Sequence, residues 1–251
     1  MFEAIRSVRR GRFVVLFAAL CLAAIFATAC SGDDDDGGAG ASPSASAIVG
    51  VKGTASPTSE TAKKINAAAI PESLAEGRRI GRADAPVVIQ AYEDFGCSHC
   101  LDFTANIEPR ILEDYVATGK MAFEYKYFPL HQLTAGAAIA AECAAQQDKF
   151  WAYHRALFIA QAEANEQAGP PLNEAFSAAG LKAIATNVGL DTATFDTCTQ
   201  GDEALNTVQD DLHKADDLAL PGTPSFVING EVTPAPVDFA GWKKLLDGLL
   251  K

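Results

Sequence analysis

The sequence predicts an α/β fold in which a central sheet is flanked by helices, and three observations support this. The β-branched, apolar run Val87–Tyr92 is typical of a buried strand. The stretch from residue 130 to about residue 201 is Ala-rich and amphipathic, which indicates a series of helices. Near the C-terminus, Phe226–Ile228 and Glu231–Val232 flank Asn229-Gly230, a signal for a two-residue hairpin turn.

The overall composition is that of a globular protein. The 251 residues are 49% hydrophobic and 21% charged, which suffices for a sizeable core and excludes a disordered, collagenous or multi-span membrane chain. The formal net charge is −12, and no basic stripe occurs beyond residue 12. Because nucleic-acid binders concentrate Lys and Arg on one surface, we expect no nucleic-acid partner.

The first 29 residues have the pattern of an export signal. Four arginines lie within the first 12 residues, and an uncharged stretch then runs to Ala29. The placement of Cys30 resembles a bacterial lipobox, in which the cysteine is lipidated, although Ala27 occupies the position where Leu is usual. The alternative is an uncleaved anchor, since the apolar stretch is just long enough to span a bilayer. Both alternatives predict an extracytoplasmic domain tethered to a membrane.

Residues 30–62 form the predicted lipid-anchored, flexible linker. Four consecutive aspartates, Asp33–Asp36, are followed by residues rich in Ala, Ser, Gly and Pro. Such a segment cannot bury enough apolar surface to offset the entropy of ordering it. We therefore expect it to hold the folded domain away from the membrane.

The sequence contains six cysteines: Cys21, Cys30, Cys97, Cys100, Cys143 and Cys198. Cys21 lies in the signal, and its removal leaves an odd number, which requires an explanation in an exported protein. Lipidation of Cys30 leaves four thiols. Cys97 and Cys100 are one natural pair, which leaves Cys143 with Cys198. The alternative for the latter two is a pair of separate, buried free cysteines.

The motif Cys97-Ser98-His99-Cys100 directly follows the Val87–Tyr92 strand. Apolar residues then recur at spacings of three and four up to Tyr115, which predicts an amphipathic helix with a kink at Pro109. Cys97 is therefore expected at a helix N-terminus, where unpaired N–H groups favour a thiolate. His99 adds a second donor or a positive charge. We expect Cys97 to be the exposed nucleophile and Cys100 the buried residue that resolves a mixed disulfide.

A Cys-X-X-Cys pair is also half of a zinc or iron–sulfur site. A closed structural site requires four ligands, and the sequence has no second closely spaced pair. Haem attachment requires His directly after the second cysteine, where this chain has Leu101. We therefore expect no metal and no cofactor.

Taken together, these motifs resemble the thioredoxin superfamily and, within it, the DsbA-like thiol–disulfide oxidoreductases. The resemblance extends from about residue 81 to the C-terminus. It rests on four segments: Asp94–Cys100, Lys120–Pro129, Cys143–His154 and Gly222–Gly230. It implies a thioredoxin fold, in which helices flank a central mixed sheet, with an inserted all-helical subdomain. The core would comprise residues 63–130 and 202–251, and the insertion residues 131–201.

The resemblance also implies roles for further residues. The Thr223-Pro224 step corresponds to a cis-proline that faces the redox disulfide, and a bond between Cys143 and Cys198 would be structural. Two positions depart from the family pattern. Ser98 replaces the proline of well-known oxidants, and Ala91 stands where many relatives carry a buried acid. Glu93 or Asp94 could replace that acid in relaying protons.

The function implied is the introduction of disulfides into unfolded exported proteins with free thiols, through a Cys97–Cys100 redox disulfide. Reoxidation would then require a membrane quinone-linked protein that is DsbB-like or vitamin K epoxide reductase-like. One alternative is a disulfide reductase or isomerase with the same site. Another is a non-enzymatic lipoprotein that binds a metal or partner through its thiols.

His154 shares a helix face with Trp151 and Phe158, so we expect a packed core histidine.

Overall fold

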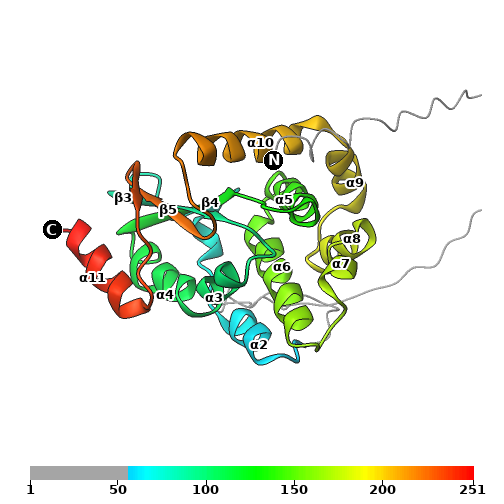
Figure 1. Ribbon diagram of the computed structural model, residues 1–251, viewed down its shortest axis with the longest axis horizontal. Helices are drawn as coiled ribbons and strands as arrows, with labels where there is room; N and C mark the ends of the chain where they lie inside the picture. The colour runs from blue at the N-terminus through cyan, green and yellow to red at the C-terminus, as the bar shows by residue number, and fades with distance from the viewer. Residues whose placement is uncertain (1–55) are drawn as a thin grey trace, which may run out of the picture. The chain divides into compact units, whose positions relative to one another are not determined.

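The computed structural model describes residues 56–251 (Figure 1), so the predicted signal, Cys30 and most of the predicted linker lie outside the described residues. Its strands form one six-stranded sheet in the order β1-β2-β4-β3-β5-β6. The strands are β1 (Ala75–Glu76), β2 (Arg79–Ile80), β3 (Val87–Glu93), β4 (Met121–Tyr127), β5 (Ser225–Ile228) and β6 (Glu231–Thr233). β3 pairs parallel with β4 and antiparallel with β5, which confirms the predicted mixed sheet.

Helices surround this sheet. They are α2 (Glu60–Ala67), η2 (Glu72–Leu74), α3 (Ser98–Asn106), α4 (Glu108–Ile111), the π-helical η3 (Leu112–Val116), α5 (Gln132–Ala145), α6 (Phe150–Asn165), α7 (Leu172–Ala175), α8 (Ala178–Asn187), α9 (Thr192–Gln200), α10 (Asp202–Asp217) and α11 (Phe239–Leu249). Every element between β4 and β5 is a helix, which confirms an all-helical insertion. This helical run continues past residue 201 through α10.

The alternation of side chains along the strands gives the sheet two different faces. Ile89 and Phe226 belong to the main core, where Phe226 packs on Trp242 of α11 with ring centroids 4.7 Å apart. Tyr92 and Val227 belong to a smaller core that includes Ala215 of α10. Figure 1 shows α10 along one side of the sheet and α3 and α4 along the other. The end of β3 therefore lies between two helical layers.

Helix α2 begins at Glu60, within the segment expected to be a linker. Ser59 caps its N-terminus by accepting a hydrogen bond from the Ala62 N–H at 3.1 Å. Ala62 and Ile65 are buried, which gives this short helix an apolar face. Helical structure therefore starts a few residues before position 63, where the core was expected to begin.

The helix that follows the cysteine motif is broken rather than kinked. α3 ends at Asn106, Ile107 adopts φ −115° and ψ −54°, and α4 begins at Glu108. Pro109 lacks an N–H group, so it cannot continue the hydrogen bonding of the preceding helix. The break lies two residues before Pro109.

The C-terminal elements follow the sequence pattern closely. Asn229 and Gly230 have φ values of +50° and +87°, as the two-residue turn between β5 and β6 requires. Asp238 caps α11 by accepting a hydrogen bond from the Gly241 N–H at 2.8 Å. Trp242 and Leu246 of α11 are buried, whereas Leu249 at its end is 44% exposed. Within residues 56–251, no helix combines the length and apolarity needed to span a membrane.

Candidate active site

The turn between β3 and α3 is fixed by Asp94. Its carboxylate accepts hydrogen bonds from the backbone N–H of Gly96 at 2.8 Å, the backbone N–H of Leu130 at 2.7 Å and the Thr134 hydroxyl at 3.1 Å. Gly96 has no room for a side chain, because a Cβ there would lie 2.6 Å from a methyl carbon of Thr134. Asp94 is thus occupied in positioning Cys97 at the N-cap of α3, which argues against a proton-relay role for it.

Cys97 carries the more acidic of two free thiols. Its side chain is partly buried, and its pKa is lowered to about 5, first by a hydrogen bond from the Cys100 thiol. The Thr223 hydroxyl and the backbone N–H groups of Cys100 and His99 lower the pKa further, whereas burial opposes them. The effect predicted for a helix N-terminus therefore acts through identifiable donors of the first turn of α3.

Cys100 is the opposite of Cys97 in exposure and in charge. Its side chain is 0% exposed. Burial raises the pKa of the Cys100 thiol well above its ordinary value, and the nearby Cys97 and Glu93 raise this pKa further. At neutral pH the reduced site therefore holds a thiolate at Cys97 and a protonated thiol at Cys100.

Thr223 and Pro224 lie beside Cys97, and the peptide bond between them is cis. The pairing of β3 with β5, in which Tyr92 faces Ser225, brings the two loops to the same edge of the sheet. The Cys97 thiol donates a hydrogen bond to the Thr223 carbonyl at 3.2 Å. The backbone before Pro224 therefore lies within reach of any group that approaches the Cys97 sulfur.

His99 contributes to this site through its backbone. Its side chain is exposed, and its effect on the pKa of Cys97 comes from its N–H group at the start of α3. The structure thus brings four of the five candidate catalytic residues together directly, namely Cys97, Cys100, Thr223 and Pro224. The imidazole of His99 lies on the surface beside them.

Glu93 supplies a buried acid close to the cysteines. It lies two residues after Ala91 on β3, and both side chains are buried. Because side chains alternate along a strand, Ala91 and Glu93 point to the same face. Burial raises the pKa of Glu93 well above its ordinary value, and the charges of Glu108 and Cys97 add to this rise. The acid missing at Ala91 is thus present two residues farther along the same strand face.

Sequence reasoning missed Glu108, a second buried acid. It is 3% exposed and faces His154, which is 1% exposed, with 3.7 Å between Glu108 Oε2 and His154 Nε2. The signal was present in the helical spacing, since Thr104, Glu108 and Ile111 follow one another at intervals of four and three. His154 packs among aromatic rings as expected, including Phe158 at 4.9 Å between centroids.

The second cysteine pair lies in the helical run. Cys143 of α5 and Cys198 of α9 are joined by a disulfide with an S–S distance of 2.03 Å.

Among residues 56–251, no group of three or more His, Cys, Asp or Glu side chains is placed to hold a metal ion. The site itself offers two unequal thiols, a buried carboxyl group and the backbone carbonyl of Thr223.

Comparisons with known proteins agree with this arrangement. The family profile described as "Thioredoxin" matches residues 73–248. The probable disulfide bond formation protein D of Bacillus anthracis is 28% identical over 175 residues, which cover 68% of this chain and 77% of that protein.

Two solved structures have the same fold. Oxidised BdbD from Bacillus subtilis matches with a TM-score of 0.60 and 22% identity, over 70% of this chain and 93% of that chain. The α-DsbA1 protein of Wolbachia pipientis also matches with a TM-score of 0.60 and 22% identity, over 74% of this chain and 95% of that chain. The family match spans well over half of the sequence. The chain therefore belongs to the thioredoxin superfamily and is a DsbA-like oxidoreductase with a thioredoxin fold.

Proposed function

We propose that this protein is an extracytoplasmic thiol–disulfide oxidoreductase that introduces disulfides into exported proteins through Cys97 and Cys100. The observation that carries the proposal is the inequality of the two thiols. Cys97 is partly exposed with a pKa lowered to about 5, whereas Cys100 is fully buried. A stabilised Cys97 thiolate stabilises the reduced form, and so makes the Cys97–Cys100 disulfide a stronger oxidant.

The proposed reaction begins with an unfolded client that has free thiols. A client thiolate attacks the Cys97 sulfur, the Cys97–Cys100 bond breaks, and its electron pair and a proton go to Cys100. A second client thiolate then attacks the client sulfur of the mixed disulfide, and Cys97 leaves as the thiolate that the first turn of α3 stabilises. The client has lost two electrons, and the enzyme has gained them.

The loop at Thr223-Pro224 supports binding of an extended client. Its carbonyl lies 3.2 Å from the Cys97 sulfur and accepts the hydrogen bond of the free thiol. A client backbone laid beside this loop would bring its cysteine to the same sulfur, as in recognition of extended peptides by β-type pairing. Thr223 and Pro224 are therefore proposed to position the client, and His99 to present its backbone N–H to the Cys97 thiolate.

Variants of the two cysteines test this mechanism. Cys97→Ser is expected to abolish oxidation of a reduced, unfolded client. Offered a client that already carries a disulfide, Cys100→Ala is expected to accumulate mixed disulfides, because the Cys97 thiolate attacks the client disulfide and no second enzyme thiol remains to resolve the product. The double variant Cys97→Ser with Cys100→Ala is the matched control and should trap no client. Wild-type turnover in either single variant would contradict the proposal, as would mixed disulfides in the double variant.

The reduction potential decides the direction of electron flow. A value near about −120 mV fits an oxidant, and a value near about −270 mV fits a reductase. An oxidant requires a partner that removes the electrons, and we propose a membrane quinone-linked protein of the DsbB-like or vitamin K epoxide reductase-like kind. A potential close to that of a reductase would favour the reductase or isomerase alternative instead.

The proposed location rests on the N-terminal sequence. We propose that residues 1–29 direct export and that a lipid on Cys30 or an uncleaved anchor tethers the domain to the membrane. Membrane fractionation of a Cys30→Ser variant distinguishes the two tethers. Release of the protein into the soluble extracytoplasmic fraction indicates lipidation, and retention in the membrane indicates an uncleaved anchor. Recovery of the wild-type protein in the cytoplasm would contradict both.

A further inference from the structure

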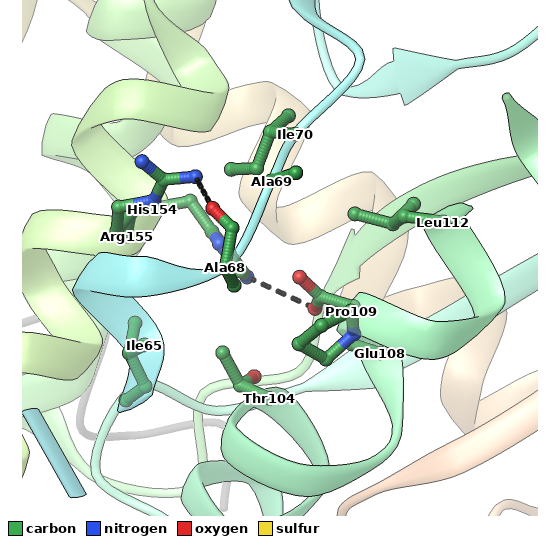
Figure 2. Close-up of a pocket in the computed structure, with 10 residues that line it drawn as sticks. All are labelled: Ile65, Ala68, Ala69, Ile70, Thr104, Glu108, Pro109, Leu112, His154 and Arg155. Atoms are coloured by element: carbon green, nitrogen blue, oxygen red, sulfur yellow. Dashed lines mark hydrogen bonds and ion pairs between the residues drawn. The ribbon is translucent and has the colours of Figure 1, made fainter. Parts of the chain in front are cut away.

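A group of buried polar atoms near the active-site turn lacks hydrogen bonds. It consists of Glu108 Oε2, both ring nitrogens of His154 and the Thr104 hydroxyl, all of them buried and without a hydrogen bond of good geometry. Glu108 lies on α4 and His154 on α6, and Figure 2 shows them facing each other. Buried polar atoms without partners are rare in proteins, so each requires an explanation.

These residues border a small cavity. Its volume is about 10 Å³, and its walls include Thr104, Glu108 and His154. Its walls also include Ala68, Ala69 and Ile70 of the segment after α2 (Figure 2). Ala69 is exposed. A cavity of this size holds about one water molecule when polar groups line it. A water molecule in this cavity would lie between the Glu108 carboxyl group and the exposed segment at Ala69.

The same group is in contact with the active site. His154 packs edge-on against Phe95, two residues before Cys97, with ring centroids 5.9 Å apart. Glu93 is close enough to Glu108 for the charge of one to affect the pKa of the other, and close enough to Cys97 and Cys100 to interact with both. Both carboxylate oxygens of Glu93 are also buried without a hydrogen bond, so Glu93 belongs to the same group of unpartnered polar side chains.

The buried thiol requires a connection to the solvent. Cys100 is 0% exposed, yet it must gain a proton when the disulfide opens and lose one when the disulfide closes. We propose that Glu108, positioned by His154, passes this proton between Glu93 and a water molecule in the cavity beside Thr104. This inference rests on the proposed thiol–disulfide chemistry. It gives Glu108 and His154 a role in that chemistry.

The charges around Glu108 suit this exchange. Burial raises the pKa of Glu108 to about 8, and the Arg155 guanidinium on α6 partly opposes the rise. Burial and Arg155 lower the pKa of His154 to about 3, so its imidazole is a neutral acceptor at physiological pH. Glu72 faces Arg155 and offsets part of that charge. Near neutral pH the pair of acids therefore retains a proton that it can transfer.

In the oxidising direction Cys100 gains one proton. The client thiolate forms a bond to Cys97, the Cys97–Cys100 bond breaks, and the Cys100 sulfur takes a proton from Glu93. Glu108 returns a proton to Glu93, and the cavity water passes one to Glu108 while it takes up another from the solvent. When the disulfide closes, Cys100 gives its proton to Glu93 and the same transfers run in reverse, while the electrons leave with the departing thiolate.

Reaction of the reduced protein with glutathione disulfide separates the relevant steps. The rate at which Cys97 attacks glutathione disulfide depends on the concentration of glutathione disulfide. The rate at which Cys100 then attacks the mixed disulfide to form the Cys97–Cys100 bond, a step called ring closure here, does not. In Glu108→Gln we expect ring closure to slow by about tenfold and to lose its pH dependence near pH 8, while attack by Cys97 stays within about twofold. Glu108→Asp should recover part of the rate. Glu113→Gln, an exposed acid on η3, is the matched control.

Two results with Glu108→Gln would contradict the proposed proton relay. Unchanged ring closure and an unchanged pH profile in Glu108→Gln would overturn the relay, and so would an equal slowing of both steps, which indicates a structural role. If Glu108→Gln does not fold, Thr104→Val is measured instead. Slower ring closure is then expected, and an unchanged rate overturns the relay. Failure of the wild-type protein to react at Cys97 would instead contradict the proposed function and is seen in the first step.

Discussion

The charge on one sulfur atom controls what this site does, and it makes the stability of the reduced protein depend on pH. The pKa of Cys97 is lowered to about 5 in the folded protein from 9.0 for an unperturbed thiol. Between these pH values the unfolded chain binds one more proton than the folded chain, so the free energy of unfolding rises with pH. The stabilisation is complete above the unfolded pKa and is lost as the pH falls through about 5.

We therefore expect the reduced protein to gain stability relative to Cys97→Ser as the pH rises from 5 to 9. The difference between their urea unfolding midpoints measures the contribution of the Cys97 charge, including its effect on the pKa values of Glu93 and Cys100. The rate of Cys97 alkylation should show a midpoint near pH 5. A midpoint near 9.0, that of an unperturbed thiol, would contradict the prediction.

Single residues differed in how far the sequence could assign them. Cys97 and Cys100 were predictable because a Cys-X-X-Cys motif after a strand has few other uses. The replacement of the acid at Ala91 by Glu93 was one of two alternatives, and only the hydrogen bonds of Asp94 separated them. The helical spacing places Glu108 on the same face as Ile111, but its contact with His154 was not predictable, because α6 is distant along the chain.

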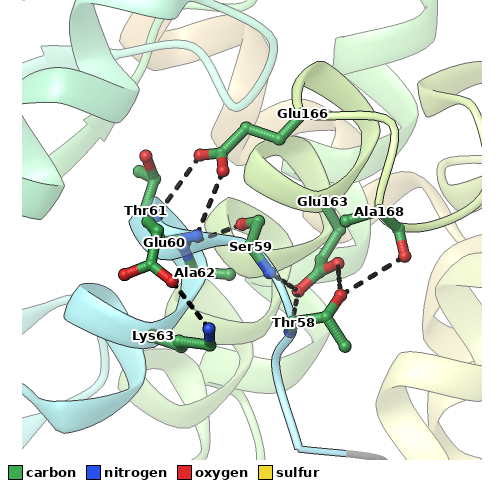
Figure 3. A network of polar contacts seen from close by, with 9 residues as sticks. All are labelled: Thr58, Ser59, Glu60, Thr61, Ala62, Lys63, Glu163, Glu166 and Ala168. Carbon is green, nitrogen blue, oxygen red and sulfur yellow. Dashed lines mark hydrogen bonds and ion pairs between the residues drawn. The ribbon is translucent and has the colours of Figure 1, made fainter.

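Among the elements, α2 shows how a short helix is held by distant side chains. Glu163 accepts hydrogen bonds from the backbone N–H groups of Thr58 at 2.7 Å and Ser59 at 3.1 Å (Figure 3). Glu166 accepts from the N–H groups of Glu60 and Thr61 at 3.1 and 3.2 Å. Both acids lie near the C-terminal end of α6, and they supply the negative charge that a helix N-terminus favours.

Replacing Glu163 and Glu166 with Ala should loosen α2 without unfolding the protein. We expect a loss of local stability in α2, since negative charges at a helix N-terminus stabilise the helix. Amide hydrogen exchange in residues 58–67 should then accelerate by about fivefold. Glu231→Ala, an exposed acid on β6, is the control. Unchanged exchange in the double variant would show that apolar packing alone holds α2.

The sequence predicted long elements better than short ones for a physical reason. α5, α6 and the β5–β6 hairpin contain their own signals, such as helical periodicity or an Asn-Gly turn. The short α2 has few such signals, and its acceptors lie more than 100 residues away on α6. The break before Pro109 likewise depends on how α4 packs, whereas the proline itself predicts only an interruption.

In the molecule as a whole, the helical run and the sheet are joined by a buried charged network. Arg78, in the turn between β1 and β2, contacts Asp211 of α10 and pairs with Glu142 of α5 at 3.1 Å. Asp211 also accepts a hydrogen bond from the backbone N–H of Tyr127 at 3.0 Å. Residues from α5, α10 and β4 thus surround one guanidinium, which the turn between β1 and β2 supplies. Their spacing in the sequence gives no sign of this, because each partner comes from a different part of the chain.

The Cys143–Cys198 disulfide is a second link at this scale, within the helical run. It closes a loop across 55 residues, which in the loop-entropy description restricts the unfolded chain by about 4 kcal/mol. Cys143→Ser with Cys198→Ser should lower the free energy of unfolding by about that amount in urea under non-reducing conditions. The comparison uses a Cys97→Ser, Cys100→Ser background, so that no other cysteine of the folded domain contributes.

The same pair of substitutions should leave the redox site intact. With Cys97 and Cys100 restored, the rate of reaction with glutathione disulfide should stay within about twofold of the wild type, because the bond joins α5 to α9 and neither helix carries a redox cysteine. Peptide mapping of the non-reduced wild-type protein should recover Cys143 linked to Cys198. If both thiols are instead alkylated without reduction, the stabilising role fails. If they are linked but their removal slows Cys97, the helical run and the active site are coupled more tightly than their separate positions suggest.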